Sequence, residues 1–157
     1  MIDALFGDIE YEFGWVGQCV WPFLGVVSST RLIIPCDDGA MISTVQREAY
    51  AAFERHKAEI CRTAEDAIFI YYRENLADLR TRFGPQFADQ WAPDIASVEG
   101  LSHLVTPSEV IIQESFGSRP ERVVSLLFEC SWEPSLGFAA KFINERLGGV
   151  GPQDIVL

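Results

Sequence analysis

The stretch Ser43–Arg82 reads STVQREAYAAFERHKAEICRTAEDAIFIYYRENLADLRTR, and it decides the fold that the sequence predicts. Its apolar residues recur every three or four positions, which places them on one side of a helix and most charged residues on the other. These apolar positions are Ala49, Phe53, Ile60, Ala64, Ala67, Ile68, Tyr71, Leu76 and Leu79. The pattern identifies a helix that forms part of the core, and it specifies no chemistry.

Both ends of this helix carry terminal signals. Ser43 followed by Gln46 fits a capping box, in which each side chain satisfies a free amide of the first turn. Arg80 and Arg82 lie near the negative end of the helix dipole, just before Gly84-Pro85. Forty residues exceed the usual helix length, so we expect a break near Thr63, which would cap a second segment.

Strand-like sequence occurs in two blocks, one on each side of the helix. The expected strands are Asp8–Trp15, Gln18–Trp21, Val26–Ile34, Glu109–Phe116, Arg122–Trp132, Leu136–Ile143 and Asp154–Val156, and a short helix is expected over residues 95–104. Several of these runs alternate apolar and polar residues, as half-buried strands do. We therefore expect one α+β domain over residues 1–157, with a mostly antiparallel sheet of six to seven strands packed against the long helix.

The formal net charge is −11 and is unevenly distributed. Residues 43–82 carry seven acids and seven bases, so the acidic excess lies in the strand-rich segments on either side. A negative surface repels phosphate, which argues against nucleic acid and against an anionic membrane as partners. It favours a basic protein or a cationic ligand, although acidity for solubility alone is the simpler explanation.

The four cysteines form no C-x-x-C pair, and Cys19, Cys61 and Cys130 lie in segments that are expected to be buried. The first residues show no basic signal-peptide region, and no apolar run is long enough to span a bilayer. We expect a cytoplasmic protein with reduced thiols.

Candidate chemistry is sparse in this sequence. His56 and Cys61 are five residues apart and would not share a helix face, so no metal site is predicted. No cofactor is predicted either, because Gly148-Gly149-Val150-Gly151 has no helix after it and is not a phosphate-binding loop. A nucleophilic pair of Cys61 or Cys130 with His103 would need the fold to bring them together, and buried structural cysteines are the expected alternative.

Carboxylates on the expected strands are the better candidates for a site. Glu10 and Glu12 share one strand face at a spacing of about 7 Å, which suits cation binding or a glycosidase pair, while a solvated strand face is the plain alternative. Glu129 and Glu133 lie at the end of another expected strand. We predict that these four glutamates contribute to binding a basic partner.

Several short segments resemble a known family. They are Tyr11–Gly17 (YEFGWVG), Gln46–Tyr50 (QREAY) with Phe53, Tyr71-Tyr72, Phe128–Trp132 (FECSW) and Gln153–Ile155 (QDI). The chain resembles an uncharacterised family of bacterial α+β domains, some of which look like immunity proteins of polymorphic-toxin systems. In many such sequences Trp is followed by an acid, a variable residue, Glu, His and Gly. Here Glu133-Pro134-Ser135-Leu136-Gly137 lacks the Glu-His pair, which puts any polar site built on it in doubt.

These observations lead to two functional hypotheses. The first is a non-enzymatic cytosolic binding protein, such as a toxin-neutralising immunity protein, whose acidic surface covers a basic partner and whose exposed Trp21 or Trp91 adds affinity. The alternative is a small-molecule-binding or enzymatic domain with a cleft between helix and sheet, formed by His103, Glu129 and Glu133. A structural homo-oligomer is a third hypothesis.

Overall fold

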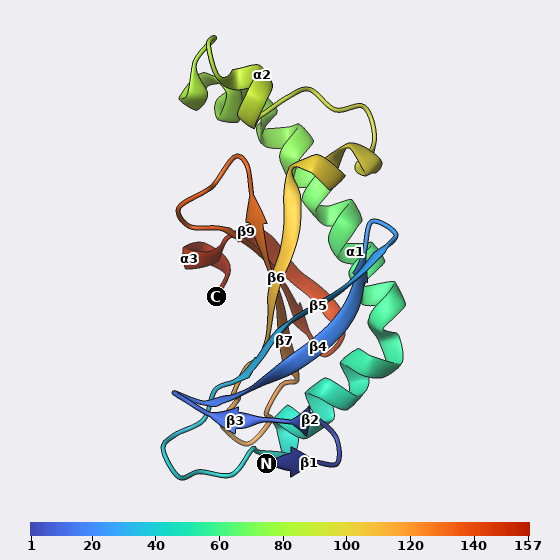
Figure 1. Ribbon diagram of the computed structural model, residues 1–157, viewed down its shortest axis with the longest axis vertical. Coiled ribbons are helices and arrows are strands. Elements are labelled where there is room, and N and C mark those ends of the chain that lie inside the picture. The colour runs from blue at the N-terminus through green and yellow to red at the C-terminus, as the bar shows by residue number, and fades with distance from the viewer.

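The computed structural model describes residues 1–157, and its central feature is a long helix lying against a twisted sheet (Figure 1). The strands are β1 (Ile2–Asp3), β2 (Gly7–Asp8), β3 (Glu10–Tyr11), β4 (Trp15–Phe23), β5 (Val26–Ile34), β6 (Val105–Ile112), β7 (Val123–Cys130), β8 (Phe138–Ile143) and β9 (Arg146–Pro152). The helices are α1 (Thr44–Phe83), α2 (Ala88–Trp91), the 3₁₀ helix η1 (Val98–His103) and α3 (Gln153–Val156). The predicted α+β class is confirmed.

Seven strands form the main sheet in the order β3-β4-β5-β6-β7-β8-β9, and β1 and β2 form a separate two-stranded sheet. All neighbours in the main sheet are antiparallel except β5 and β6, which are parallel. A parallel pair requires a long crossover connection. Helix α1 and the helices that follow it form this crossover. This explains why they lie between two blocks of strands in the sequence.

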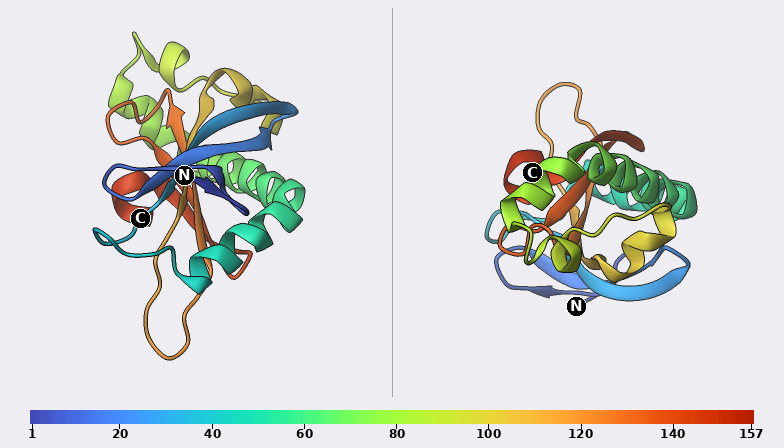
Figure 2. Two further views of the ribbon diagram at one scale, coloured as in Figure 1. Left: turned by 60° about the horizontal axis from the view of Figure 1, so that its bottom comes forward. Right: turned by 90° about the horizontal axis from the view of Figure 1, so that it is seen from above.

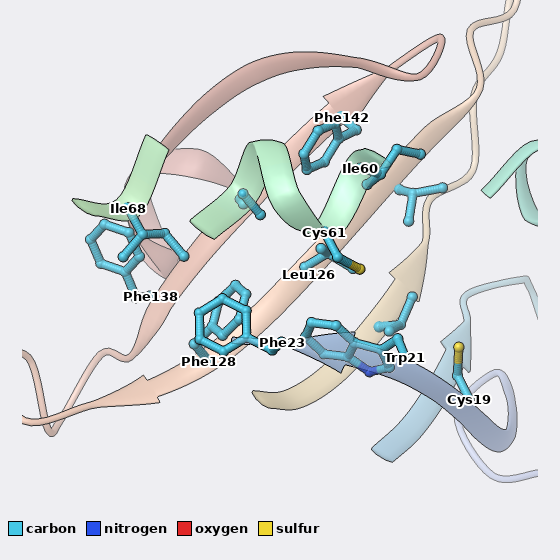
Figure 3. Packing of buried hydrophobic residues seen from close by; sticks show 14 of the residues in the cluster. Cys19, Trp21, Phe23, Ile60, Cys61, Ile68, Leu126, Phe128, Phe138 and Phe142 are labelled. Atoms are coloured by element: carbon cyan, nitrogen blue, oxygen red, sulfur yellow. The ribbon is translucent and has the colours of Figure 1, made fainter. Parts of the chain in front are cut away.

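The core lies between α1 and one face of the sheet (Figures 2 and 3). Its largest fully buried side chains include Trp21, Phe53, Ile68, Tyr72, Phe128, Phe138 and Phe142. The Trp21 indole N–H donates to Thr30 Oγ1 at 2.9 Å, and its ring lies edge-on to Phe128. Trp21 is 0% exposed, so the prediction that it supplies an exposed binding aromatic is wrong. Position 21 faces the core because residues 19, 21 and 23 share the buried side of β4.

Helix α1 begins and ends as the sequence predicts. Both hydrogen bonds of the capping box between Ser43 and Gln46 are present, and Gly84 closes the helix at φ +77°. The predicted break in the helix is present, but it lies at His56 (φ −108°, ψ 16°), seven residues before the expected position near Thr63. The next residue, Lys57, donates from Nζ to the Val20 carbonyl at 2.6 Å, which ties this point of the helix to β4.

Two predicted strands have a different structure. Residues 8–15 do not form one strand: Asp8 ends β2, and residues 10–16 form a tight hairpin of β3 with the start of β4, with the fully exposed Phe13 at its tip. Gly14 lies in this turn with φ +148°. Glycine is favoured there because a Cβ would lie 3.0 Å from the Ile34 carbonyl oxygen. At the other terminus, Gly148–Gly151 belongs to β9, and residues 153–156 form helix α3 in place of the predicted last strand.

The boundaries of the later elements also shift. Strand β6 begins at Val105, four residues before the predicted start, and the short helix expected over residues 95–104 is the 3₁₀ helix η1. None of the helices combines the length and the apolar character that a bilayer-spanning segment requires.

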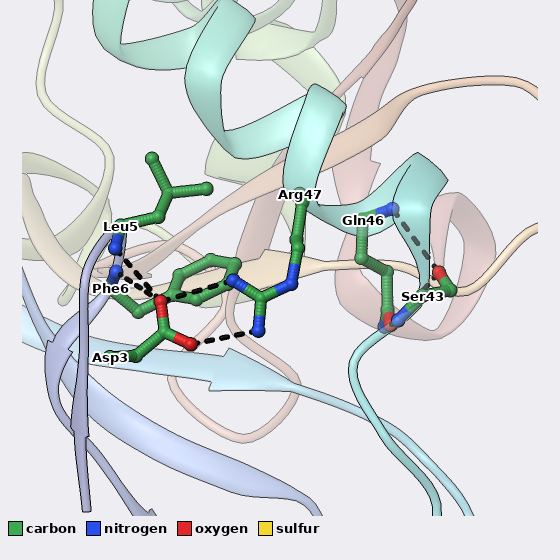
Figure 4. Close-up of polar contacts among 6 residues, drawn as sticks. All are labelled: Asp3, Leu5, Phe6, Ser43, Gln46 and Arg47. Atoms are coloured by element: carbon green, nitrogen blue, oxygen red, sulfur yellow. Dashed lines mark hydrogen bonds and ion pairs between the residues drawn. The ribbon is translucent and has the colours of Figure 1, made fainter.

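The start of α1 is fixed to both sheets by polar side chains (Figure 4). Arg47 forms two hydrogen bonds with the Asp3 carboxylate, at 3.1 and 2.8 Å, and this carboxylate also accepts from the Leu5 and Phe6 amides. Gln46 is fully buried, and its amide donates to the carbonyls of Pro35 and Ile112. These contacts hold the N-terminal hairpin and the loop after β5 in place.

Candidate functional site

The four predicted partner-binding glutamates lie at two ends of the molecule. Glu10 and Glu12 belong to the β3–β4 hairpin, which lies near the N-terminus at one end (Figure 1). Glu129 pairs with Thr106 where β6 begins and β7 ends, at the end that carries α2. The structure therefore divides the predicted site into two separate regions.

The first region, here called the acidic pole, consists of Glu10, Glu12, Phe13, Asp37, Asp38 and Met41, all of them exposed. Three cations near it already have partners: Arg31 pairs with Glu12 at 3.1 Å, Arg47 with Asp3 at 2.8 Å, and the N-terminal ammonium of Met1 with Asp8 at 3.7 Å. Glu10, Asp37 and Asp38 form no ion pair. The acidic pole thus presents uncompensated negative charge beside an exposed aromatic ring and a Met side chain.

Contacts between the hairpin and the loop after β5 hold the acidic pole together. The Tyr11 hydroxyl donates to the Cys36 carbonyl at 3.4 Å. Loss of hydration, followed by the nearby Asp38 carboxylate, raises the pKa of Tyr11. A cavity of about 380 Å³ lies between these segments and includes Trp15, Met41 and Asp38 in its lining. The buried Trp15 indole N–H has no hydrogen-bond partner.

The second region, here called the end pocket, is a cavity of about 790 Å³, the largest of the cavities described here. Its lining consists of Phe83, Trp91, His103, Leu104, Thr106, Ser108, Glu109, Phe128, Glu129, Cys130, Ser131, Pro134, Ser135, Leu136, Gly137 and Gln153. These residues come from the end of α1, α2, η1, strands β6 and β7, the loop between β7 and β8, and the start of α3.

Hydrogen bonds fix the walls of the end pocket. The Ser131 hydroxyl donates to the Trp91 carbonyl at 2.7 Å, which joins α2 to the end of β7. Arg82 at the end of α1 pairs with Glu133 at 3.4 Å. The Gln153 amide donates to the Gly137 carbonyl at 3.3 Å, so α3 is held against the loop between β7 and β8.

A β-bulge in β6 contributes consecutive side chains to the end pocket. The register with β7 shifts between Pro107 and Glu109, and both Ser108 and Glu109 line the cavity. Regular strand alternation would send neighbouring side chains to opposite faces, and a bulge redirects one of them. Sequence reasoning missed Ser108 and Glu109; Pro107 inside a strand was the available signal, because proline in a sheet marks an edge or a bulge.

Two of the three residues of the predicted cleft come together in the end pocket. His103 and Glu129 both line it, whereas Glu133 does not and instead pairs with Arg82. Cys130 also lines the pocket, but burial raises the pKa of its thiol to about 12. Since the thiolate is the reactive form, this cysteine is not activated as a nucleophile.

The remaining candidate residues are structural or exposed. Cys19 and Cys61 are buried and reduced, and burial raises the pKa of the Cys61 thiol to about 12. His56 lies at the bend of α1 on the surface. No group of three or more His, Cys, Asp or Glu side chains is arranged to hold a metal ion.

The architecture defines an α+β domain in which one long helix crosses a seven-stranded sheet and a cavity opens at one end of that sheet. Residues 5–157 match the family model described as a domain of unknown function (DUF6985), and the chain belongs to this family. Comparison with curated proteins found no match. Comparison with solved structures found none either.

The end pocket also contains the segment in which the sequence departs from the sequences it resembles. Ser135 and Leu136, which stand where many of those sequences carry Glu-His, both line the cavity.

Proposed function

We propose that this protein is a non-enzymatic, cytoplasmic protein-binding domain that docks a basic partner on its acidic pole, in the manner of a bacterial immunity protein that covers a toxin. The observation that carries the proposal is the uncompensated charge of Glu10, Asp37 and Asp38 around the exposed Phe13. Complementary charge speeds association, and an aromatic side chain at the centre of an interface supplies affinity.

The shape of the acidic pole supports a macromolecular partner. Phe13 and Met41 project from two different segments, and the apolar cavity of about 380 Å³ lies beside Met41. A side chain of the partner that entered this cavity would contact Trp15 in its lining. Occlusion of a basic surface requires no catalytic group, which agrees with the protonated thiols of this chain.

Affinity capture from the native host with matched variants tests the proposal. The pole variant combines Glu10→Gln, Asp37→Asn and Asp38→Asn. The control combines Asp66→Asn, Glu74→Gln and Asp78→Asn, which are exposed residues of α1 outside any ion pair. Both variants lose the same formal charge.

We expect the wild type and the control to retain one basic protein, and the pole variant to lose it. The association rate should fall about tenfold in the pole variant at low salt, because steering depends on local charge. Equal retention by both variants, or capture of no protein at all, would contradict the proposal.

A second candidate function is favoured by the end pocket. His103 and Glu129 share a concave site whose volume is typical of small-molecule sites. In this case the domain binds a small molecule in the cleft, and Glu133 acts only as a support through Arg82. The two functions use opposite ends of the molecule and are compatible with each other.

A further inference from the structure

We propose that the end pocket binds a small organic cation, of the substituted-ammonium type, through Glu109, Glu129 and an aromatic wall that includes Trp91. The inference assigns a ligand class to the second candidate function. It does not depend on the acidic pole, because the two regions share no residue.

The side chains that line the end pocket have a negative net charge. The end pocket contains Glu109 and Glu129 but no Lys and no Arg. Neither glutamate forms an ion pair or a side-chain hydrogen bond. This differs from Glu133, just outside the cavity, which is already neutralised by Arg82. Two free carboxylates in one concave site favour a ligand with positive charge.

Aromatic residues line the same cavity. Phe83 and Trp91 line the cavity, and Trp91 remains 40% exposed although α2 is held by the Ser131 hydroxyl. The faces of Trp and Phe attract ammonium groups, and tryptophan does so most strongly. Carboxylates and aromatic faces together are the usual means of recognising a substituted ammonium, whose apolar surface and charge both need a partner.

The backbone of the surrounding elements shapes the walls of the cavity. The β6 bulge directs both Ser108 and Glu109 into the cavity. Gly137 has φ +69°, and a Cβ there would lie 2.5 Å from Gln153 Nε2, so this wall is packed closely enough to exclude a side chain. A site whose walls are already fixed loses less conformational entropy when a ligand binds. Leu104 and Leu136 add apolar surface for the body of the ligand.

A small molecule fits these observations better than a partner side chain. The lining comes from seven segments of the chain, and the volume of about 790 Å³ lies within the range of small-molecule sites. A lysine side chain would fill only part of this space. The proposal therefore names a free organic cation, and a bound peptide is one of the outcomes that the experiment separates.

Calorimetric titration of the full chain with choline chloride tests the proposal, with 3,3-dimethylbutan-1-ol as the neutral molecule of the same shape. Choline should bind at one site, and the neutral alcohol should bind at least tenfold more weakly. Sodium phosphate and a lysine-containing tripeptide form the remaining arms. Tighter binding of phosphate, of the alcohol or of the tripeptide than of choline would overturn the proposal, as would the absence of choline binding.

Variants locate the site. Glu129→Gln and Trp91→Phe should each weaken choline binding, Glu129→Gln by about tenfold. Glu121→Gln, an exposed residue of the loop between β6 and β7, is the matched control and should bind as the wild type does. Thermal unfolding of each variant shows whether it is folded. Unchanged affinity in a folded Glu129→Gln protein would overturn the assignment to this pocket, while capture on the acidic pole would be unaffected.

Discussion

The acidic pole and the end pocket both carry unpaired carboxylates, yet their surroundings differ. At the acidic pole, Glu10, Asp37 and Asp38 stand on exposed segments beside a projecting Phe13. In the end pocket, Glu109 and Glu129 lie within a concave lining with Trp91. The same charge therefore suits two classes of ligand: an exposed acidic surface fits a large basic surface, and an acidic cavity with aromatic walls fits a small cation.

The two regions also differ in how they are anchored. Asp3 and Arg47, which hold the hairpin next to the acidic pole, form a two-bond pair in which the Asp3 side chain is only 9% exposed. The Arg82–Glu133 pair beside the end pocket has a 60% exposed arginine. The pole should therefore depend on its ion pair, whereas the pocket should depend on its backbone contacts and packing.

The largest expected effect is a loss of folding stability on substitution in the core, compared with substitution in the end pocket. Trp21→Ala should lower the free energy of unfolding by about 3–5 kcal/mol, because it opens a cavity among Thr30, Phe23 and Phe128. Trp91→Ala should cost about 1 kcal/mol or less, since Trp91 is 40% exposed. Urea unfolding of both variants measures the difference. Equal losses of unfolding free energy would show that Trp91 is a core residue and does not form a wall of the end pocket.

The next effect compares the two anchors. Arg47→Met should lower the free energy of unfolding by about 1.5–3 kcal/mol, because the little-exposed Asp3 carboxylate loses two charged hydrogen bonds. Arg82→Met should cost less than about 1 kcal/mol. Chemical unfolding monitored by tryptophan fluorescence measures both. A larger loss of unfolding free energy for Arg82→Met than for Arg47→Met would contradict the proposed difference in anchoring between the acidic pole and the end pocket.

A smaller effect tests the packing of the pocket wall. Gly137→Ala should cost about 1–2 kcal/mol through its positive φ, and its Cβ should also displace Gln153. Gly25→Ala is the matched control, because Gly25 has φ +79° and open space around the Cβ position. Only Gly137→Ala should change choline affinity in the titration. Identical behaviour of the two variants would mean that the wall is not tightly packed.

The smallest effect depends on pH. The hydrogen bonds from Arg47 hold the pKa of Asp3 well below its usual value, against the opposing effect of burial. A lowered folded pKa gives stability that is complete above the unfolded value of about 3.9 and is lost as the pH falls further. The stability difference between wild type and Arg47→Met should thus be constant above about pH 5 and narrow below about pH 4. A difference that stays constant down to pH 3 would contradict this role of Asp3.

The helix and its caps could be predicted from the sequence because they depend on local signals. Ser43, Gln46 and Gly84 act within a few residues of their own positions. Position 21 was misassigned because an indole ring suits a core or an interface, and only pairing with β5 shows which way it faces. Residues 8–15 follow the alternating pattern of one strand, although they contain the end of β2 and the turn between β3 and β4 at Gly14.

The sites depend on distant contacts, and this limits what the sequence predicts about them. The four predicted glutamates lie in separate regions because strand order, which no local pattern encodes, places β3 and the end of β7 apart. Asp37 and Asp38 lie outside every predicted element, and Glu109 begins a predicted strand whose pattern gives no sign of a bulge. The convergence of His103 with Glu129 requires the register of β6 against β7, which includes the bulge.

The central claim is that the two acidic regions bind separately. The most direct test is amide chemical-shift mapping of ¹⁵N-labelled protein with choline and with hexalysine as a minimal basic chain. Choline should shift residues around the end pocket, such as Glu129 and Trp91, and hexalysine should shift residues of the acidic pole, such as Phe13 and Asp38. The choline affinity should be the same when hexalysine is saturating. Shifts in one common set of residues, or competition between the two probes, would contradict the claim.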